Sequence, residues 1–285
     1  MAHGHRRVVT ALCRTFELSR QAYYRHADGR LRTRFQVVIV VQLACRIRMR
    51  QPRIGGKKLY HLLQDDFERL DFKLGRDKFY SLLQSEKLLV SPRKKRCKTT
   101  DSSHEHPVYP NLLAGARLYR PFQVIAADIT YIRLQEGFCY LSLVTDLFTR
   151  VIIGWCLSES LDARGPIQAL RYARLAMGAE RRCIHHSDQG VQYACADYVS
   201  LLFRFKMRIS MTETGSPGQN AVAERVNGIL KCELLLDGTF RTYKAALPAV
   251  HEAIEIYNHE RPHFSLGLLT PVQFLQQQRP KTRLG

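Results

Sequence analysis

The apolar positions of this chain follow one period up to about residue 92 and another from about residue 119. In the first part, apolar residues recur three and four positions apart, which is the spacing of amphipathic helices. In the second part, short apolar runs of strand length come first and then alternate with helical patterns. The two patterns predict an all-helical region followed by an α/β domain.

The helical region opens with a pattern typical of a helix-turn-helix. Residues 6–26 contain a short amphipathic stretch, a break, and a second stretch that Ser19 can cap. The second helix carries Arg20 among other polar side chains of the kind that read a DNA groove. An ordinary pair of antiparallel helices has the same pattern, so both interpretations stay open here.

Three more helices are predicted before residue 92, over residues 35–49, 55–65 and 75–88. The first is ambiguous, because the run from Val37 to Val41 favours a strand, whereas the length of the segment favours a helix. Together these helices would form a second DNA-binding unit. Its basic rim is predicted to comprise Lys57, Lys58, Arg76 and Lys78.

The second part of the chain has the element order of an RNase H-like fold. Three consecutive strands are expected first, with Gly137 at the turn between the first two, as in an antiparallel meander. The expected strands cover residues 124–133, 138–146, 150–158, 182–187 and 208–212, and the helices cover 163–178, 195–205 and a long segment from Asn220. This order predicts an α/β fold with a mixed five-stranded sheet and flanking helices.

These patterns divide the chain into five predicted segments. They are an N-terminal helix-turn-helix (1–30), a second helical DNA-binding domain (31–92), a basic linker (93–118), an RNase H-like catalytic core (119–275) and a C-terminal tail (276–285). The linker begins with Arg93-Lys94-Lys95-Arg96. Its basic, polar and non-periodic sequence is typical of a solvated connection or of a segment that follows phosphates.

The charge of the chain is strongly positive and unevenly distributed. The net charge is +19; residues 1–100 carry 24 Lys and Arg against 8 Asp and Glu, whereas the remaining residues carry 20 against 17. A cationic region of this kind favours polyanions such as DNA, although charge for solubility alone is an alternative. No apolar run approaches the roughly 20 residues of a membrane span. The eight cysteines include no C-x-x-C pair, which argues against structural zinc and for a reducing, cytosolic compartment.

Three acidic residues stand out in the second part of the chain. Asp128 lies in the middle of an apolar strand, Asp188 ends another strand, and Glu224 follows after 35 intervening residues. A carboxylate within an apolar strand is costly to bury unless a cation or hydrogen bonds compensate. The end of a strand is a favoured ligand position in α/β sheets. Taken alone, Asp128 could instead form a salt bridge, and Glu224 could lie on a solvated helix face.

The helix from Asn220 is predicted to have a polar face and an apolar face. At about 100° per residue, Glu224 falls on the side opposite the apolar residues. Lys231, two turns further on, would then be placed to contact a DNA end, with Asn227 beside it. The polar face comprises Asn220, Glu224, Asn227 and Lys231, and the apolar face comprises Val222, Val226 and Ile229.

The three acids together predict a metal site. Mg²⁺ prefers octahedral oxygen ligation and shares its shell with waters and phosphate oxygens. Two such ions ~4 Å apart activate a nucleophile and stabilise the leaving oxygen of an in-line phosphoryl displacement. We therefore predict that Asp128, Asp188 and Glu224 are catalytic and bind two Mg²⁺ ions, with Mn²⁺ as a substitute.

Other polar residues near these acids have structural interpretations as well. Asp146 would either be a neighbour of the metal or form a salt bridge with Arg150 across a hairpin, and the salt bridge is the favoured interpretation. The pair His185-His186 is expected to support the site or the core, since Mg²⁺ favours oxygen ligands. His263 together with Arg261 would either contact DNA or cap a terminal helix.

Several motifs resemble those of a known family. They are Asp128-Ile129-Thr130-Tyr131, Gly154-Trp155, His186-Ser187-Asp188-Gln189-Gly190, the stretch from Asn220 to Gly228, a closing segment with Tyr257-Asn258, Arg261-Pro262-His263, Leu266 and Thr270-Pro271, and, in the helical part, the stretch from Gln51 to Tyr60. On these motifs, the chain resembles the OrfB-type transposases of insertion sequence family three, which have a retroviral-integrase-like catalytic core. The resemblance covers nearly the whole chain, including the interval between the last two acids and the basic residue seven positions after Glu224.

The resemblance implies DNA transposition: cleavage at the ends of an insertion sequence frees 3′-hydroxyls, which then attack another phosphodiester. It implies that Asp128, Asp188 and Glu224 are the metal ligands, that terminal repeats and target DNA are the partners, and that the protein acts as a homo-oligomer on DNA in a bacterial cytoplasm, associated with the nucleoid. It also implies an upstream OrfA partner or fusion, since the chain starts where the downstream product usually starts and has no leucine-zipper heptads. The alternatives are a nuclease of the same fold that cuts without joining, and a catalytically silent DNA-binding regulator.

Overall fold

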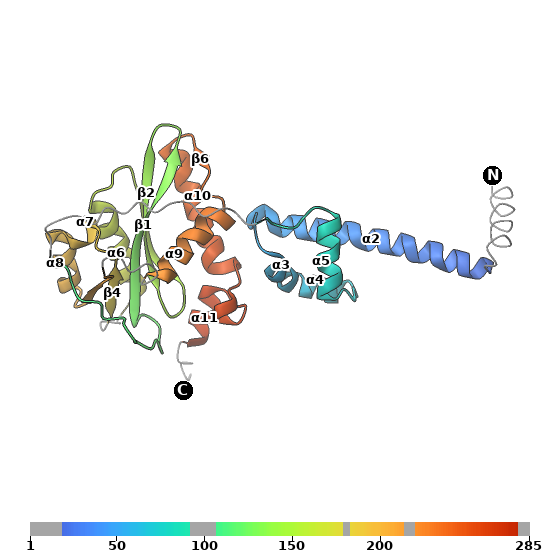
Figure 1. Cartoon of the computed structure of the whole chain (residues 1–285), viewed down its shortest axis with the longest axis horizontal. Coiled ribbons are helices and arrows are strands. Elements are labelled where there is room, and N and C mark those ends of the chain that lie inside the picture. Colours follow the sequence, from blue (N-terminus) through green and yellow to red (C-terminus); the bar gives the residue numbers. More distant parts are fainter. Residues whose placement is uncertain (1–18, 92–106, 179–182, 214–219, 279–285) are drawn as a thin grey trace. The chain divides into compact units, whose positions relative to one another are not determined.

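The computed structural model describes residues 19–91, 107–178, 183–213 and 220–278. The chain forms two compact units (Figure 1). The first comprises Met1–Met49 and Gly55–Val90, and the second comprises Arg50–Ile54 and Ser91–Gly285. None of the helices in the described ranges is long and apolar enough to cross a membrane.

In its described part, the first unit consists of helices and the loops that join them. Its centre is an aromatic cluster in which the rings of Tyr60, Phe67 and Phe79 lie 5.4 to 6.1 Å apart. Val40 and Ala44, one turn apart on the long helix, are buried as well. The helices are α2 (Arg20–Arg50), α3 (Gly56–Leu62), α4 (Gln64–Arg69) and α5 (Arg76–Ser85).

Helix α2 differs from the sequence prediction. It begins directly after Ser19, as expected, but it runs without a break to Arg50, so the second helix of the predicted helix-turn-helix and the helix predicted at 35–49 are one element. The helix contains no proline, and its single interior glycine, Gly29, costs only about 1 kcal/mol. The first helix of the predicted helix-turn-helix lies outside the described residues. No helix end therefore marks the predicted domain boundary at residue 30.

The second unit is built on one mixed sheet, and this confirms the predicted RNase H-like fold class. Strands β1, β2 and β3 form an antiparallel meander, and β4 and β5 continue the sheet in parallel from β1, in the order β3-β2-β1-β4-β5. A two-residue strand, β6, which the sequence did not predict, pairs with β1. The strands are β1 (Val124–Leu134), β2 (Phe138–Asp146), β3 (Ile152–Ser158), β4 (Ile184–Ser187), β5 (Arg208–Met211) and β6 (Thr239–Phe240).

Helices cover both faces of this sheet (Figure 1). On one face, Ile125 and Ala127 of β1 belong to a buried cluster with Leu170 and Tyr198 from α6 and α8. On the other face, Ile132 belongs to a second cluster, which includes residues of α9 and α10. The helices of this unit are α6 (Arg164–Ala176), α7 (Val191–Ala194), α8 (Ala196–Arg204), α9 (Ala221–Gly228), α10 (Tyr243–Glu255) and α11 (Pro271–Gln278), with π-helical turns η1 (Ile229–Glu233) and η2 (Ile256–Glu260) and the 3-10 turn η3 (Phe264–Leu266).

Part of the predicted linker packs on the sheet. The backbone N–H of Leu112 donates to the Ser210 hydroxyl at 2.9 Å, and Leu113 and Leu118 pack against a buried cluster that includes Val124. Residues 92–106, which contain the basic run, lie outside the described residues. At the other end, α11 extends to Gln278, three residues past the predicted end of the core.

Candidate active site

Asp128 lies on the central strand β1, next to the parallel strand β4. The two strands pair in a constant register, with Val124 opposite Ile184 and Ala126 opposite His186. Continuing this register by two residues places Asp128 opposite Asp188, which is the first residue after β4. The fold therefore brings together two acids that are far apart in the sequence.

The Asp128 carboxyl group is held by two hydrogen bonds. Its Oδ1 accepts from the backbone N–H of Ile129 at 3.0 Å, and its Oδ2 accepts from the Asn227 side-chain amide at 2.5 Å. Burial nevertheless raises its pKa to about 7, and the negative charge of Asp188 and, more weakly, that of Glu224 act in the same direction. Both hydrogen bonds oppose this rise. The surroundings of Asp128 therefore supply too little positive charge to compensate its ionised form.

Asp188 lies in a loop whose backbone is well fixed. Its Oδ1 accepts from the Gly190 N–H at 3.0 Å. The neighbouring Gln189 donates its side-chain amide to the Thr212 carbonyl at 2.8 Å, which ties the loop to the end of β5. A turn of this kind holds the carboxylate at the carboxyl edge of the parallel strands, where α/β sheets place ligands.

Helix α9 carries the third acid, and its polar side lies against β1. Asn220, at its N-terminus, donates to the Ala127 carbonyl at 3.3 Å, and Asn227 donates to Asp128. Glu224 is exposed between them, and its charge reaches Asp128. The predicted two-sided helix is present, but after Gly228 it widens into the π-helical turn η1, so the spacing of 100° per residue does not hold as far as Lys231.

Asn227 has a role in the structure that the sequence did not indicate. It was predicted to contact DNA, but it is only 8% exposed, and its amide is engaged by Asp128. The position of Asn227 three residues after Glu224 could have indicated a place beside the acids, since this spacing puts both side chains on one helix face. We therefore leave Asn227 out of the DNA-contacting set.

Replacing Asn227 by alanine is expected to weaken any binding of a divalent cation at Asp128. The carboxylate of Asp128 would lose a donor that favours its charged form, so its pKa would rise further. Partners of this kind typically contribute 10- to 100-fold to metal affinity or activity, so a rise of about 10-fold in the Mn²⁺ dissociation constant is expected. Titration of the protein with Mn²⁺, followed by electron paramagnetic resonance, measures this. Unchanged Mn²⁺ affinity would show that the amide does not support Asp128.

The carboxylate oxygens of Asp128, Asp188 and Glu224 are of the kind that a hard divalent cation prefers. These three side chains do not by themselves form a complete coordination shell. In the described part of the chain, no group of three or more His, Cys, Asp or Glu side chains already has the arrangement of a metal site. Mg²⁺ requires less than that, because it usually binds one or two carboxylates and completes its shell with waters and phosphates. The negative charge of Asp188 helps to raise the pKa of Asp128, so these two carboxyl groups are the candidates for that pair. Glu224, exposed and more weakly coupled, is available as a further ligand.

The other residues predicted to bind DNA lie in different surroundings. Lys57 and Arg76 are exposed in the first unit, and Arg76 pairs with the adjacent Asp77 at 3.2 Å. Lys58 is only 7% exposed, so it is not part of an exposed basic rim, and we leave it out of the DNA-contacting set. Lys231 is half-buried within η1. Arg20 begins α2, but its side chain lies outside the described residues.

The two histidines before Asp188 are buried. His185 Nε2 lies 2.9 Å from the Tyr198 hydroxyl, and His186 Nδ1 lies 2.9 Å from the Ser210 hydroxyl. Burial lowers the pKa of His185 to about 3, so this imidazole stays neutral. Both rings therefore have the supporting position in the core that the sequence suggested.

Asp146 has a structural role in the turn between β2 and β3. It is buried, and its carboxylate accepts from the Thr149 N–H at 3.0 Å, the Thr149 hydroxyl at 2.6 Å and the Phe122 N–H at 3.0 Å. These hydrogen bonds replace the predicted salt bridge with Arg150, because the carboxylate caps its own turn instead of reaching across the hairpin.

The chain is similar to several known proteins. The integrase core domain family matches residues 119–217, and a second family with the same description matches residues 205–271. The insertion element IS600 uncharacterized 31 kDa protein of Shigella sonnei is 31% identical over 278 residues, which cover 93% of this chain and 98% of that protein. Transposase InsF for insertion sequence IS3A of Escherichia coli (strain K12) is 32% identical over 273 residues, 93% of each protein. Among solved structures, the HTLV-2 integrase catalytic core domain in complex with magnesium is 18% identical, with a TM-score of 0.45 over 55% of this chain and 99% of that one.

Proposed function

Because the chain belongs to the IS3 family of insertion-sequence transposases, we propose that it cuts DNA at the ends of an insertion sequence and joins the freed ends to another phosphodiester. The observation that supports this proposal is the parallel register of β1 and β4, in which Ala126 lies opposite His186; two residues further along each chain lead to Asp128 and Asp188. Two carboxylates at the carboxyl edge of a parallel strand pair, with Glu224 on the adjacent helix, form a site for phosphoryl transfer.

Each residue of the site has a proposed role. Asp128, Asp188 and Glu224 would hold two Mg²⁺ ions, or Mn²⁺ in their place, and such ions activate the nucleophile and stabilise the leaving oxygen. Asn227 orients the Asp128 carboxylate. In cleavage, water attacks the phosphorus at the end of the element, the P–O3′ bond breaks, and the 3′ oxygen takes up a proton. In joining, that 3′-hydroxyl attacks the target phosphodiester, gives up its proton and displaces the 3′ oxygen of the target strand, so no covalent enzyme intermediate forms.

The charge distribution supports DNA as the partner. The excess of Lys and Arg lies in residues 1–100, and polycationic surfaces bind DNA with a strong dependence on salt. We propose that Lys57, Arg76 and Arg20 contact the terminal repeats and that Lys231 contacts the DNA end beside Glu224. We further propose that the protein acts as a homo-oligomer on DNA, together with an upstream OrfA portion.

The decisive experiment incubates the full-length protein and an OrfA portion with a labelled element-end duplex and Mg²⁺. Wild type is expected to give cleaved and joined products, and Glu224→Gln is expected to reduce both by at least about 100-fold, since a lost metal ligand removes several kcal/mol of transition-state stabilisation. Glu255→Gln, which neutralises an exposed carboxylate on α10, is the matched control and should retain activity.

The products distinguish the proposed function from its alternatives. Cleavage without joined product would favour a nuclease. Binding of the duplex without any metal-dependent cleavage, even with the OrfA portion present, would favour a DNA-binding regulator and overturn the proposal.

A further inference from the structure

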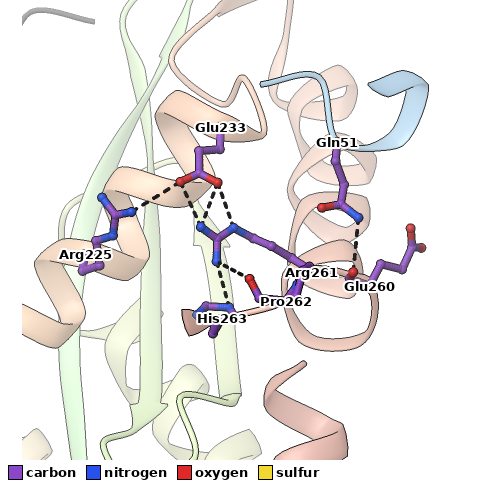
Figure 2. Close-up of polar contacts among 7 residues, drawn as sticks. All are labelled: Gln51, Arg225, Glu233, Glu260, Arg261, Pro262 and His263. Carbon is purple, nitrogen blue, oxygen red and sulfur yellow. Dashed lines mark hydrogen bonds and ion pairs between the residues drawn. The ribbon is translucent and has the colours of Figure 1, made fainter. Parts of the chain in front are cut away.

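An ion pair between Glu233 and buried Arg261 lies at the end of the helical segment that carries Glu224 (Figure 2). The guanidinium of Arg261 is only 2% exposed and forms a two-pronged contact with the Glu233 carboxylate, with N···O distances of 2.8 to 2.9 Å. Its remaining nitrogen lies 3.1 Å from His263 Nε2 and 3.5 Å from the Pro262 carbonyl. The Arg225 guanidinium reaches the same carboxylate from outside, at 3.5 Å.

This pair differs from an ordinary surface salt bridge because Arg261 is buried, whereas the Glu233 side chain is 21% exposed. Burial lowers the pKa of Arg261, and the charge of Glu233 is the largest effect that opposes this. Arginine stays protonated even so, and the loss of one partner from a buried pair leaves an uncompensated charge. The position of Glu233 is therefore strongly tied to that of Arg261.

Glu233 and Arg261 lie at the C-terminal ends of two helical segments, each of which finishes in a π-helical turn. Glu233 is the last residue of η1, which continues α9, and Arg261 directly follows η2, which continues α10. Within η2, the Asn258 amide bonds both backbone groups of Ile152 on β3, at 3.0 Å each. The contacts thus run from the sheet through η2 and the ion pair to the end of the α9–η1 segment.

A short segment, Arg50–Ile54, completes this anchorage, and we call it the strap. The N–H of Arg53 donates to the Glu233 carbonyl at 3.2 Å, and the Gln51 amide donates to the Glu260 carbonyl at 3.2 Å. The carbonyls at a helix end have no partner within the helix, so the strap satisfies one at the end of each π-helical turn. Arg50 adds contacts to the carboxylates of Glu260 and Glu252.

We propose that Glu233, Arg261 and the strap are positioning elements for the proposed metal site. Helix α9 has only eight residues, and a helix of that length is marginal without tertiary support. Its N-terminal half lies against β1 through Asn220, and the anchorage fixes the other end. The position of Glu224 and Asn227 relative to Asp128 then depends on an ion pair that touches neither metal nor DNA. This inference rests on the proposed function.

The test follows two properties of the full-length protein, the Mg²⁺ concentration for half-maximal cleavage and the hydrogen exchange of residues 221–233. Glu233→Gln is expected to raise the Mg²⁺ requirement by about 10-fold, as for other groups that orient metal ligands. It is also expected to speed exchange in this segment while leaving α6 unchanged. Gln51→Ala should shift both properties in the same direction by a smaller factor, because it removes a strap contact and leaves the ion pair intact.

Control variants separate positioning from general stability. Glu255→Gln neutralises an exposed carboxylate on α10 that belongs to neither the ion pair nor the strap, and it should leave both properties within about two-fold, as exposed ion pairs contribute little. If Glu233→Gln does not fold, the double variant Glu233→Gln/Arg261→Gln, which removes both charges, takes its place. An unchanged Mg²⁺ requirement overturns the proposal, whether or not exchange speeds up, because a purely structural role would affect exchange alone.

Failure of the proposed function can be told apart from failure of this inference. If wild type shows no metal-dependent cleavage, the proposed function falls. Binding of Mn²⁺, followed by electron paramagnetic resonance, then replaces the cleavage midpoint. Equal Mn²⁺ affinity of wild type and Glu233→Gln overturns the positioning role.

Discussion

Asp128→Asn is expected to abolish strand cleavage and, without metal, to make the protein more stable than wild type at pH 8. Asparagine has almost the same shape but cannot supply a negative oxygen to a metal ion. Several kcal/mol of transition-state stabilisation depend on such ligands, and each 1.4 kcal/mol corresponds to a factor of ten. The rate is therefore expected to fall by about 10³-fold or more, with binding of the DNA end unaffected.

The gain in stability follows from the raised pKa of Asp128. Its ordinary pKa is 3.8, and burial together with Asp188 raises it to about 7 in the folded protein. Between these two pH values the folded state holds a proton that the unfolded chain has released. The contribution of Asp128 to the free energy of unfolding is therefore fully present below about pH 4 and lost above about pH 7. Unfolding free energy of the metal-free wild type should fall over this window by an amount on the order of a few kcal/mol. Asp128→Asn lacks this dependence.

Fluorescence of Trp155, the one tryptophan of the chain, measures this unfolding, because it lies on β3 of the same unit. Wild type and Asp128→Asn are unfolded with urea from pH 4 to pH 8 in the presence of a chelator, and the difference between them should widen as the pH rises. Adding Mn²⁺ at pH 8 should stabilise only wild type. Parallel curves at all pH values would show that the carboxyl group of Asp128 titrates at its ordinary pKa.

Gly154→Ala is expected to destabilise the second unit severely. Gly154 lies on β3 beneath α6, and a Cβ atom there would lie 2.6 Å from the backbone nitrogen of Ala173, 2.9 Å from its Cβ and closer still to the carbonyl oxygen of Ala169. These are mostly backbone atoms, which cannot rotate away. Overpacking of a core costs 1–3 kcal/mol or more, and rigid neighbours place this substitution at about 3 kcal/mol or above.

Gly228→Ala is the matched control for this substitution. Gly228 has an ordinary helical backbone, and a Cβ atom there would meet nothing within 4 Å. Alanine at such a position stabilises by about 0.4–1 kcal/mol. Urea unfolding, followed by Trp155 fluorescence, should move to lower midpoint for Gly154→Ala and to slightly higher midpoint for Gly228→Ala. Equal midpoints would mean that α6 can lift away from β3 at little cost.

The sequence predicted best what depends on local pattern. Strands β1 and β2 lie where apolar runs and Gly137 indicated them, because strand period and turn chemistry are local properties. The proposed acids also followed from local context, Asp128 from its apolar strand and Asp188 from the end of the next parallel strand. What the sequence could not supply was the register between these strands, which sets the two acids opposite each other.

The errors concern features that depend on tertiary contacts. The helix predicted over the Val37–Val41 run is confirmed in spite of its strand propensity, but α2 extends well beyond the predicted bounds, to Arg20 and Arg50. Lys58 was expected on a basic rim but is buried, whereas the adjacent Lys57 is exposed. Successive side chains of a helix point about 100° apart, so the two lysines lie on different faces of α3. The pair of Arg261 and Glu233 joins residues 28 positions apart, and neither the spacing nor the residue types predict such a contact.

The π-helical turn after Gly228 also constrains the number of residues in this part of the chain. A π turn closes its hydrogen bonds over one more residue than an α turn. Deleting one residue from Ile229–Glu233 would be absorbed by a return to α-helical winding, whereas deleting one residue from α9 would rotate all that follows by about 100°. The carboxylate of Glu233 would then face away from Arg261, although the three acids of the site were still present. For α9, a change in length is therefore expected to be less tolerable than many changes in composition.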